Sequence, residues 1–288
     1  MSLPPSDAVL AAAQREGART RERGLAGDGS VPNLIVAMDD AEPVIEHTEE
    51  VYSGEGATDL GLLAVALEAN TGALHYPEPD LTASGPWLVL EPLSGFVSTV
   101  HTGTGRLSVE LAYDRSSDHH LETIVDRVDG LLTTARPSHD QYPVADDAQG
   151  IFRTGMTEVA PTAITTTEDS ITASFDISTT PATSGAALAA AFEALDDVTN
   201  VEYRSIVGVE RAAPSERLRS AVEDAHLHVL DDAEYDWFPR PTVFSRIPGG
   251  EKIAFGTGVR TADEFDAAAY ATGMELLTAS LSNLGEHK

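Results

Sequence analysis

Apolar residues recur every three to four positions in several parts of the chain, the spacing typical of an amphipathic helix. In one segment, Leu62, Leu63 and Ala66 share a face, and Thr58 or Asp59 stands where a helix N-cap is expected. Helix-forming composition and spacing predict helices at residues 6–23, 60–69, 121–132, 184–195, 215–227 and 262–284.

Short runs of apolar residues predict strands that are buried on both faces. Such runs cover residues 33–38, 87–90 and 252–255. Further strands are predicted at 106–113, where apolar and polar residues alternate, and at 151–159, 170–177, 200–206 and 241–244. Residues 42–55 are acidic and residues 71–86 hold several prolines and glycines, so both segments are predicted to be loops.

The order of these elements predicts an α/β protein whose middle third is an insertion. Residues 103–203 follow the order strand–helix–strand–strand–helix–strand, which is that of a ferredoxin-like module. Residues 1–102 and 204–288 combine helices with short buried strands. We therefore expect one discontinuous, catalytic-type α/β domain interrupted by a ferredoxin-like domain.

The charge of the chain indicates a salt-rich environment. Its 288 residues include 47 acidic and only 18 basic ones, for a net charge of −29. Such a surface repels itself at low ionic strength, whereas in about 1 M salt the Debye length falls to about 3 Å and screens the repulsion. A halophilic protein from a salt-filled cytoplasm is the plainest interpretation, and an acidic mesophilic protein is the alternative.

Composition also excludes several classes of protein. The chain has no cysteine, which rules out disulfides and thiolate zinc sites. Residues 1–24 carry no secretory pattern, and no stretch approaches the roughly 20 apolar residues of a membrane span. No basic stripe is present to neutralise phosphates, so nucleic acid is not an expected partner. We expect a soluble, cytoplasmic protein.

Acidic residues follow three of the predicted strands or turns. Asp39 and Asp40 come after the strand at 33–38, Asp59 follows a Gly-x-Gly turn, and Glu91 ends the strand at 87–90. The ends of strands and the loops that follow them are where α/β sheets place ligand sites. Carboxylates there can bind a metal, but each can equally be a helix cap or a solvated turn residue.

The nine histidines are not arranged as an obvious zinc site, in which imidazoles accompany carboxylates. They are spread over loops, helix ends and the tail, and His226 near a helix end is more typical of a partner for the helix dipole. The sequence also has neither a Gly-x-Ser-x-Gly elbow nor a phosphate-binding P-loop.

Taken in order, the motifs resemble those of the zinc-dependent deacylases and exopeptidases (metallopeptidase family twenty). This family includes acetylornithine deacetylase, succinyl-diaminopimelate desuccinylase and carboxypeptidase G. The matching segments are Ala37-Met38-Asp39, Gly54-Glu55-Gly56-Ala57-Thr58-Asp59-Leu60-Gly61, Leu90-Glu91-Pro92-Leu93, and Phe255-Gly256-Thr257-Gly258 followed by Asp263-Glu264. The resemblance implies zinc as the cofactor, with Asp59 and Glu91 as ligands, and a lid domain through which the chain forms a homodimer.

The sequence departs from the family pattern at the positions of the imidazoles. Ala37 and Arg260 stand where the family has metal-binding histidines, and the family's Glu-Glu pair is missing. Within the lid, His119 or His120 loosely matches an active-site histidine, while Ser178 replaces an arginine. A guanidinium beside carboxylates offers an ion pair in place of a metal ligand.

Two functions follow from this combination. The first is a degenerate deacylase that does not hydrolyse amides and serves as a binding or assembly subunit, with an N-acyl amino acid as a candidate ligand. The second is an active hydrolase of N-acyl amino acids or small peptides with a rebuilt site. In that case Asp59 and Glu91 bind the metal, Asp39 orients a ligand, and His120 polarises the scissile amide.

Overall fold

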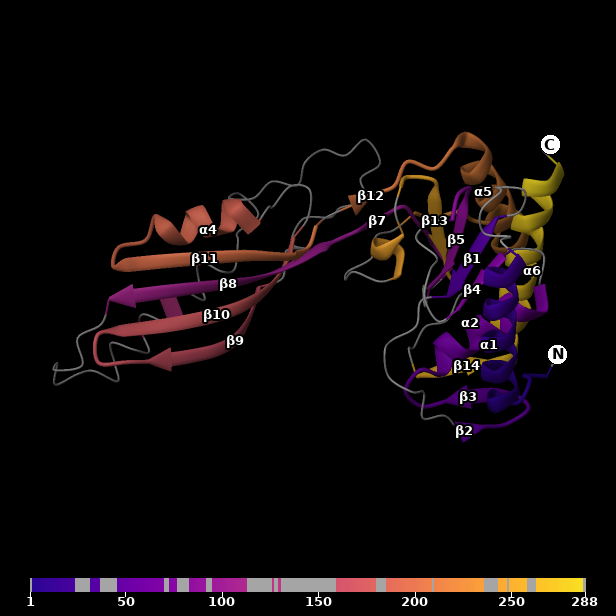
Figure 1. Ribbon diagram of the computed structural model, residues 1–288, viewed down its shortest axis with the longest axis horizontal. Coiled ribbons are helices and arrows are strands. Elements are labelled where there is room, and N and C mark those ends of the chain that lie inside the picture. The colour runs from indigo at the N-terminus through magenta and orange to yellow at the C-terminus, as the bar shows by residue number, and fades with distance from the viewer. Residues whose placement is uncertain are drawn as a thin grey trace. The chain divides into compact units, whose positions relative to one another are not determined.

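The computed structural model divides the chain into two compact units (Figure 1). The first contains residues 1–99, 211–236 and 242–288, and the second contains residues 100–210 and 237–241. The residues described are 2–23, 32–36, 46–69, 73–76, 83–91, 95–112, 126, 129–130, 159–179, 185–208, 210–235, 243–247, 249–257 and 263–286.

A five-stranded sheet forms the centre of the first unit. Its strand order is β4 (Ala73–His75), β1 (Asn33–Val36), β5 (Trp87–Leu90), β13 (Lys252–Phe255) and β6 (Val97–Ser98). The first four strands are parallel, and β6 pairs antiparallel with β13. The strands predicted at 87–90 and 252–255 are confirmed, whereas the loop predicted at 71–86 contains β4.

Four helices pack as one layer in the order α1 (Ser6–Arg23), α2 (Ala57–Ala69), α6 (Ala267–Glu286) and α5 (Glu216–Leu230). The helices cover one face of the sheet. On that face, every second residue of the parallel strands is apolar, and these side chains form a continuous row that packs against the helix side chains. The row consists of Leu34, Val36, Leu74, Leu88, Leu90, Ile253 and Phe255, all buried in the same core cluster as Leu60 and Leu277. Burial of this row is the main apolar contribution to the stability of the unit.

The opposite face of the sheet carries buried polar side chains. The side chains of Asn33 and His75 meet at 2.9 Å between Oδ1 and Nε2, and the His75 ring lies 4.4 Å from that of Trp87. The amide nitrogen of Asn33 donates to the Ser84 carbonyl at 3.0 Å. These bonds satisfy groups that would be costly to bury unpaired.

Lys252 lies on the same face of the sheet and is fully buried. Its Nζ donates to the carbonyls of Phe244 at 3.0 Å and Ile247 at 2.6 Å and lies 4.7 Å from the centroid of the Phe244 ring. Phe244 belongs to the short 3₁₀ helix η2 (Val243–Arg246). The strand predicted at 241–244 is therefore wrong over its described residues, because the chain turns there to cap an ammonium group.

A small antiparallel sheet completes the unit, with strand order β14 (Glu264–Asp266), β3 (Val51–Ser53) and β2 (Glu46–His47). Strands β2 and β3 lie in the segment 42–55, which the sequence predicts to be a loop. Strand β14 lies within the helix predicted at 262–284, so α6 begins later, at Ala267. Strands of two or three residues are too short to show a periodic pattern.

The second unit is built on a four-stranded antiparallel sheet with the order β11 (Val198–Val207), β8 (Gly103–Ala112), β10 (Ser170–Thr179) and β9 (Val159–Thr166). Helix α4 (Gly185–Glu193) connects β10 to β11 and packs on one face of the sheet. The predicted helix at 121–132 lies outside the described residues except at 126, 129 and 130, and residues 151–158 of a predicted strand lie outside them altogether.

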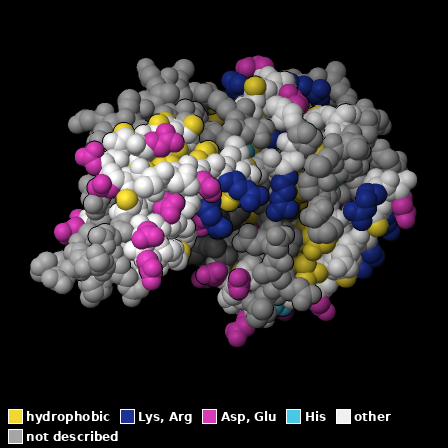
Figure 2. All heavy atoms as spheres, turned by 60° about the vertical axis from the view of Figure 1, so that its left-hand side comes forward, with side chains coloured by type: hydrophobic (Ala, Val, Ile, Leu, Met, Phe, Trp, Pro, Cys, Tyr) yellow, Lys and Arg dark blue, Asp and Glu magenta, His cyan; other side chains and the backbone are white. Residues whose placement is uncertain are grey.

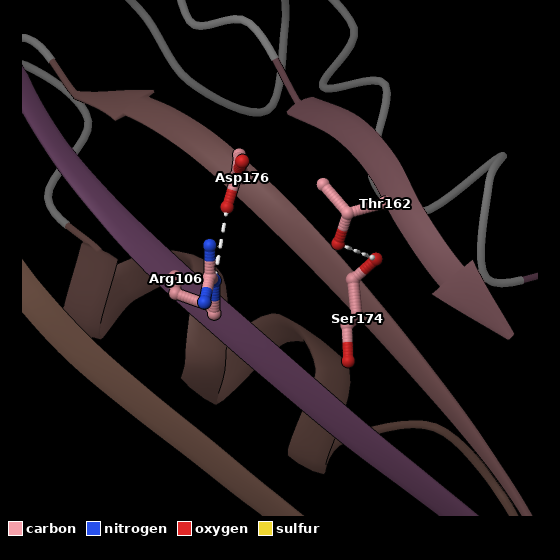
Figure 3. A network of polar contacts seen from close by, with 4 residues as sticks. All are labelled: Arg106, Thr162, Ser174 and Asp176. Atoms are coloured by element: carbon pink, nitrogen blue, oxygen red, sulfur yellow. Dashed lines mark hydrogen bonds and ion pairs between the residues drawn. The ribbon is translucent and has the colours of Figure 1, made fainter. Parts of the chain in front are cut away.

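The two faces of this sheet differ in polarity. Leu107, Phe175 and Ile177 face α4, with the Phe175 and Phe192 ring centroids 5.7 Å apart. On the other face, Arg106 Nε donates to Asp176 Oδ1 at 3.1 Å, as Figure 3 shows. Also in Figure 3, the Thr162 hydroxyl donates to the Ser174 carbonyl at 3.1 Å. These contacts are exposed and contribute little to stability.

The predicted α/β fold with an inserted ferredoxin-like domain is confirmed, since the strand order β11-β8-β10-β9 is that of a ferredoxin-like sheet. Strands β7 (Val100–His101) and β12 (Glu210–Arg211) lie where the chain passes from one unit to the other. On the face shown in Figure 2, the carboxylate side chains of the described residues are scattered and do not gather in one patch. Among the described residues, no helix has the length and apolar character to cross a membrane.

Gly61 of α2 tests the packing of the helical layer. A Cβ at this position would lie 2.1 Å from a ring carbon of Phe265, which is fully buried. We expect Gly61→Ala to lower the free energy of unfolding by about 1–3 kcal/mol through overpacking. Urea unfolding followed by circular dichroism at constant KCl measures this change.

The matched control is Gly285→Ala in α6, where a Cβ meets nothing within 4 Å. Its free energy of unfolding should stay unchanged or rise slightly, because alanine is the better helix former. Equal losses in both variants would contradict the proposed contact with Phe265.

Candidate functional site

The carboxyl ends of the parallel strands bring two of the sequence motifs to the same edge of the central sheet. Val36 is paired with Leu90, and Leu90 is paired with Phe255, so β1, β5 and β13 end level with one another. Glu91 directly follows Leu90, and Gly256 directly follows Phe255. This edge is where parallel sheets bind their ligands.

Glu91 is held firmly at this edge. Its backbone N–H donates to the Phe255 carbonyl at 3.1 Å, which extends the pairing of β5 with β13 by one residue. Its side chain is buried, with 1 % of its surface exposed. A carboxylate is costly to bury unless it is compensated by a cation or by hydrogen bonds, so its presence here is a specific feature of this edge.

Asp59 is positioned by a turn that requires glycine. Gly54 and Gly56 have φ angles of 117° and 83°, in the left-handed region that other residues rarely adopt. The Gly54 N–H donates to the Asp263 carbonyl at 2.9 Å, which ties the turn to the segment preceding α6. Helix α2 begins at Ala57, so Asp59 lies in its first turn.

This position corrects one of the sequence interpretations. Thr58 and Asp59 are expected to cap a helix that starts at Leu60, but both lie inside α2. Asp59 is half-buried, and its charge is favoured there by the partial positive charge of the helix N-terminus.

The direction of α2 places Asp59 on the side of the sheet where Glu91 lies. A Cβ built on Gly273 of α6 would be 2.6 Å from the Thr257 side chain and 3.0 Å from that of Val65 in α2. Thr257 lies two residues beyond the end of β13, so the middle of α2 lies near the carboxyl ends of the strands. After Val65, α2 continues towards the amino end of β4. Asp59 precedes Val65 by six residues, about 9 Å along the helix, so it lies on the side of the sheet where the strands have their carboxyl ends.

Several candidate positions of the sequence analysis lie outside the described residues. Among them are Ala37, Asp39, Asp40, His119, His120 and Arg260. The predicted catalytic roles of Asp39 and His120 therefore stay predictions, as do the predicted metal-binding roles of Asp59 and Glu91.

Two of the described histidines make buried hydrogen bonds elsewhere. His75 bonds to Asn33 on the polar face of the sheet, and the Nδ1 of His101 contacts the Thr102 carbonyl at 2.8 Å. His47 and His228 are exposed. Within the described part of the chain, no three His, Cys, Asp or Glu side chains gather closely enough to hold a metal ion.

Zinc is the cofactor implied by the motifs, and the described residues do not fit it. Zinc sites in proteins use at least three protein ligands, commonly with imidazoles among them. The described residues provide Asp59 and Glu91 on one side of the sheet, and no described histidine belongs to a metal-binding cluster with them. Two carboxylates alone are a weak, oxygen-only site of the kind that suits harder cations.

His226 is a buried group that the sequence pattern does not reveal. It lies in α5 with its ring edge-on to that of Phe255, at 5.4 Å and 90°, and its Nδ1 contacts the Val222 carbonyl at 2.8 Å. Its Nε2 is buried and has no hydrogen-bond partner in the described structure. Desolvation lowers the pKa of His226 below its usual 6.5, and the bond to Val222 opposes this shift.

Known proteins resemble this chain in fold but not in sequence. A scan against protein-family models finds no match, and neither does a search of curated proteins. Aminopeptidase PepT from Bacillus cereus ATCC 10987 matches over 90 % of this chain and 82 % of its own, with a TM-score of 0.59 and 11 % identity. Human carnosine dipeptidase 1 matches over 90 % and 81 %, with a TM-score of 0.55 and 12 % identity.

An M20 family metallo-carboxypeptidase from Sulfolobus solfataricus also matches, over 89 % of this chain and 86 % of its own, with a TM-score of 0.54 and 9 % identity. At such low identity the likeness is one of fold. The chain has the fold of the M20 metallopeptidases, which confirms the architecture that the motif resemblance implies.

His226 predicts a pH dependence of stability. Because its pKa is lower in the folded than in the unfolded chain, the unfolded state binds more protons below pH 6.5. The contribution of neutral His226 to the free energy of unfolding is therefore fully present above pH 6.5. It is lost as the pH falls towards the pKa of His226 in the folded chain. Urea unfolding of the wild type and of His226→Gln between about pH 7.5 and 5.5 should show a flatter profile for the variant.

The exposed His228, two residues away in the same helix, provides the control. His228→Gln should keep the wild-type pH profile. If His226→Gln also keeps it, the burial of a neutral His226 is not the cause of the acid sensitivity.

Proposed function

We propose that this chain is an M20-type amidohydrolase scaffold that no longer hydrolyses amides and acts as a binding or assembly subunit. Its structural neighbours are peptidases. Its sequence keeps the motif order of the zinc-dependent deacylase family that it resembles. An N-acyl amino acid is a candidate ligand for the carboxyl edge of the central sheet. The acidic composition suits work in a salt-rich cytoplasm.

One observation carries the proposal. Val36 ends β1 level with Leu90, the residue that precedes Glu91 in the chain. In the sequence, Val36 is followed by Ala37, at the position where the family that the motifs resemble has a metal-binding histidine. An alanine side chain cannot ligate a metal, so this motif lacks the ligand that would accompany Asp59 and Glu91.

The glycines of the motif at residues 54–61 have a structural role that does not require catalysis. Gly54 and Gly56 are required by their positive φ angles, and Gly61 is required by the ring of Phe265. These glycines support the fold whether or not the site is active, which is what a scaffold that has lost its reaction would keep.

An active metal-dependent hydrolase is the second candidate, and the burial of Glu91 favours it. A carboxylate buried at the carboxyl edge of a parallel sheet is a feature that a cation site would use. In this case Asp59 and Glu91 would hold the metal, with Asp39 and His120 assisting. Asp59→Ala would then abolish turnover.

We also propose that the chain forms a homodimer through the lid, the second unit. Strand β9 lies at one edge of its sheet, and within the described residues no strand pairs with its outer side. Ile164 in β9 is 44 % exposed, which is unusual for a large apolar side chain. Pro161 has no N–H, so pairing with a second copy would be confined to residues 162–166.

Metal content and amide hydrolysis test the proposed loss of activity. The purified protein, kept in about 3 M KCl, should contain far less than one zinc per chain by plasma mass spectrometry after incubation with zinc and desalting. It should release no free amine from N-acetyl amino acids or dipeptides. Zinc near two per chain, or amine release that Asp59→Ala abolishes, would establish the active hydrolase in its place.

Ala37→His is the matched gain-of-ligand variant. It restores the imidazole of the first motif, which together with Asp59 and Glu91 would complete three zinc ligands, so zinc content should rise towards one per chain. The rise should vanish in the double variant Ala37→His/Asp59→Ala. No gain from Ala37→His would show that Asp59 and Glu91 do not converge as proposed.

The lid dimer predicts an effect of charge at Ile164. Light scattering should give twice the chain mass for the wild type and a single chain mass for Ile164→Lys, because a lysine on an edge strand opposes pairing. Thr199→Lys on β11, the other edge strand, is the control and should remain dimeric. A dimeric Ile164→Lys protein would exclude β9 as the contact.

A further inference from the structure

The first unit contains a groove of about 870 Å³ that the proposed function does not use. It lies between α1, α2, the start of α6 and the chain's first residues, and neither Asp59 nor Glu91 lines it. Its volume is within the range of small-molecule sites, about 300–1,000 Å³. The groove is therefore large enough for a ligand the size of a dipeptide.

Defined hydrogen bonds build the wall formed by the chain's first residues. Leu3 N–H donates to the Glu49 carbonyl at 3.0 Å, and the buried Tyr52 hydroxyl donates to the Pro4 carbonyl. Val9 N–H donates to the Pro5 carbonyl at 3.1 Å, which joins this wall to α1. The groove thus has fixed sides, which reduces the entropy lost on binding.

The floor of the groove is apolar, and its rim carries both signs of charge. Leu3, Val9 and Ala64 are buried lining residues. On the rim, Arg19 Nη1 forms an ion pair with Glu16 Oε2 at 3.2 Å. Arg15 also lines the groove and has no hydrogen-bond or ion-pair partner among the described residues.

Two further carboxylates line the groove together with Arg15. Glu49 and Glu68 line the groove from β3's preceding turn and from α2, and Arg15 lines it from α1. Glu68 is close enough to Tyr270 to add to the effect of burial, which raises the pKa of the Tyr270 hydroxyl. The Tyr270 hydroxyl therefore stays protonated at neutral pH, and Tyr270 lines the groove.

We propose that this groove binds a dipeptide-sized zwitterion with apolar side chains. Arg15 pairs with the carboxylate of the ligand, Glu49 or Glu68 pairs with its ammonium group, and the floor of Leu3, Val9 and Ala64 covers its side chains. A ligand that carries only negative charge is disfavoured by the two carboxylates and by the net charge of −29. A purely apolar ligand would leave the charged rim unpaired.

Calorimetric titration of the full chain with L-leucyl-L-leucine tests the proposal. The Asp59→Ala variant is used throughout, so that turnover or binding at the carboxyl edge cannot account for the signal. We expect saturable binding at one site. The N-acetylated dipeptide, which lacks the ammonium group, and the dipeptide amide, which lacks the carboxylate, should each bind at least about tenfold more weakly.

Substitutions assign the signal to the groove. Arg15→Gln should weaken binding about tenfold, and Ala12→Trp, which fills the groove from α1, should abolish it. Arg204→Gln, an exposed arginine of the second unit, should leave binding unchanged. Absence of binding, equal binding of the amide, or an unchanged affinity of Arg15→Gln would each overturn the proposal, and none of these results bears on zinc content.

Discussion

The register of the four parallel strands is the constraint on which the rest of the first unit depends. It aligns alternate residues of β4, β1, β5 and β13 into the single apolar row that the helices cover. A shift by one residue would turn that row outward and bring the polar residues under the helices. The same register makes β1, β5 and β13 end together, so the packing of the core also fixes which residues meet at the carboxyl edge.

The sequence predicts those elements that are long or wholly apolar. The helix at 6–23 and the strands at 87–90 and 252–255 have the bounds expected from the sequence, because their patterns do not depend on distant neighbours. The strands β2, β3, β4 and β14 are missed, since each has two or three residues and exists only through its pairing. Apolar residues near 243 also form a 3₁₀ helix in place of a strand, because Lys252 needs carbonyl partners.

The candidate site could be predicted only in part. Motif order identifies Asp59 and Glu91, and the strand register explains why Glu91 lies at the ligand-binding edge. The burial of His226 could not be foreseen, because a helical pattern does not tell which neighbour covers a given face. The groove was equally inaccessible to sequence reasoning, since it joins the first residues to α2 and α6 across more than two hundred positions.

The buried ammonium of Lys252 has a consequence for the chemistry of the surface. The sequence has only two lysines, and the other is the last residue, so the folded body presents its positive charge through arginine alone. Acetylating enzymes and amine-reactive cross-linkers therefore find no side-chain target on the described surface. Modification of Lys252 would report that β13 has separated from η2, and so would serve as an intrinsic marker of local opening.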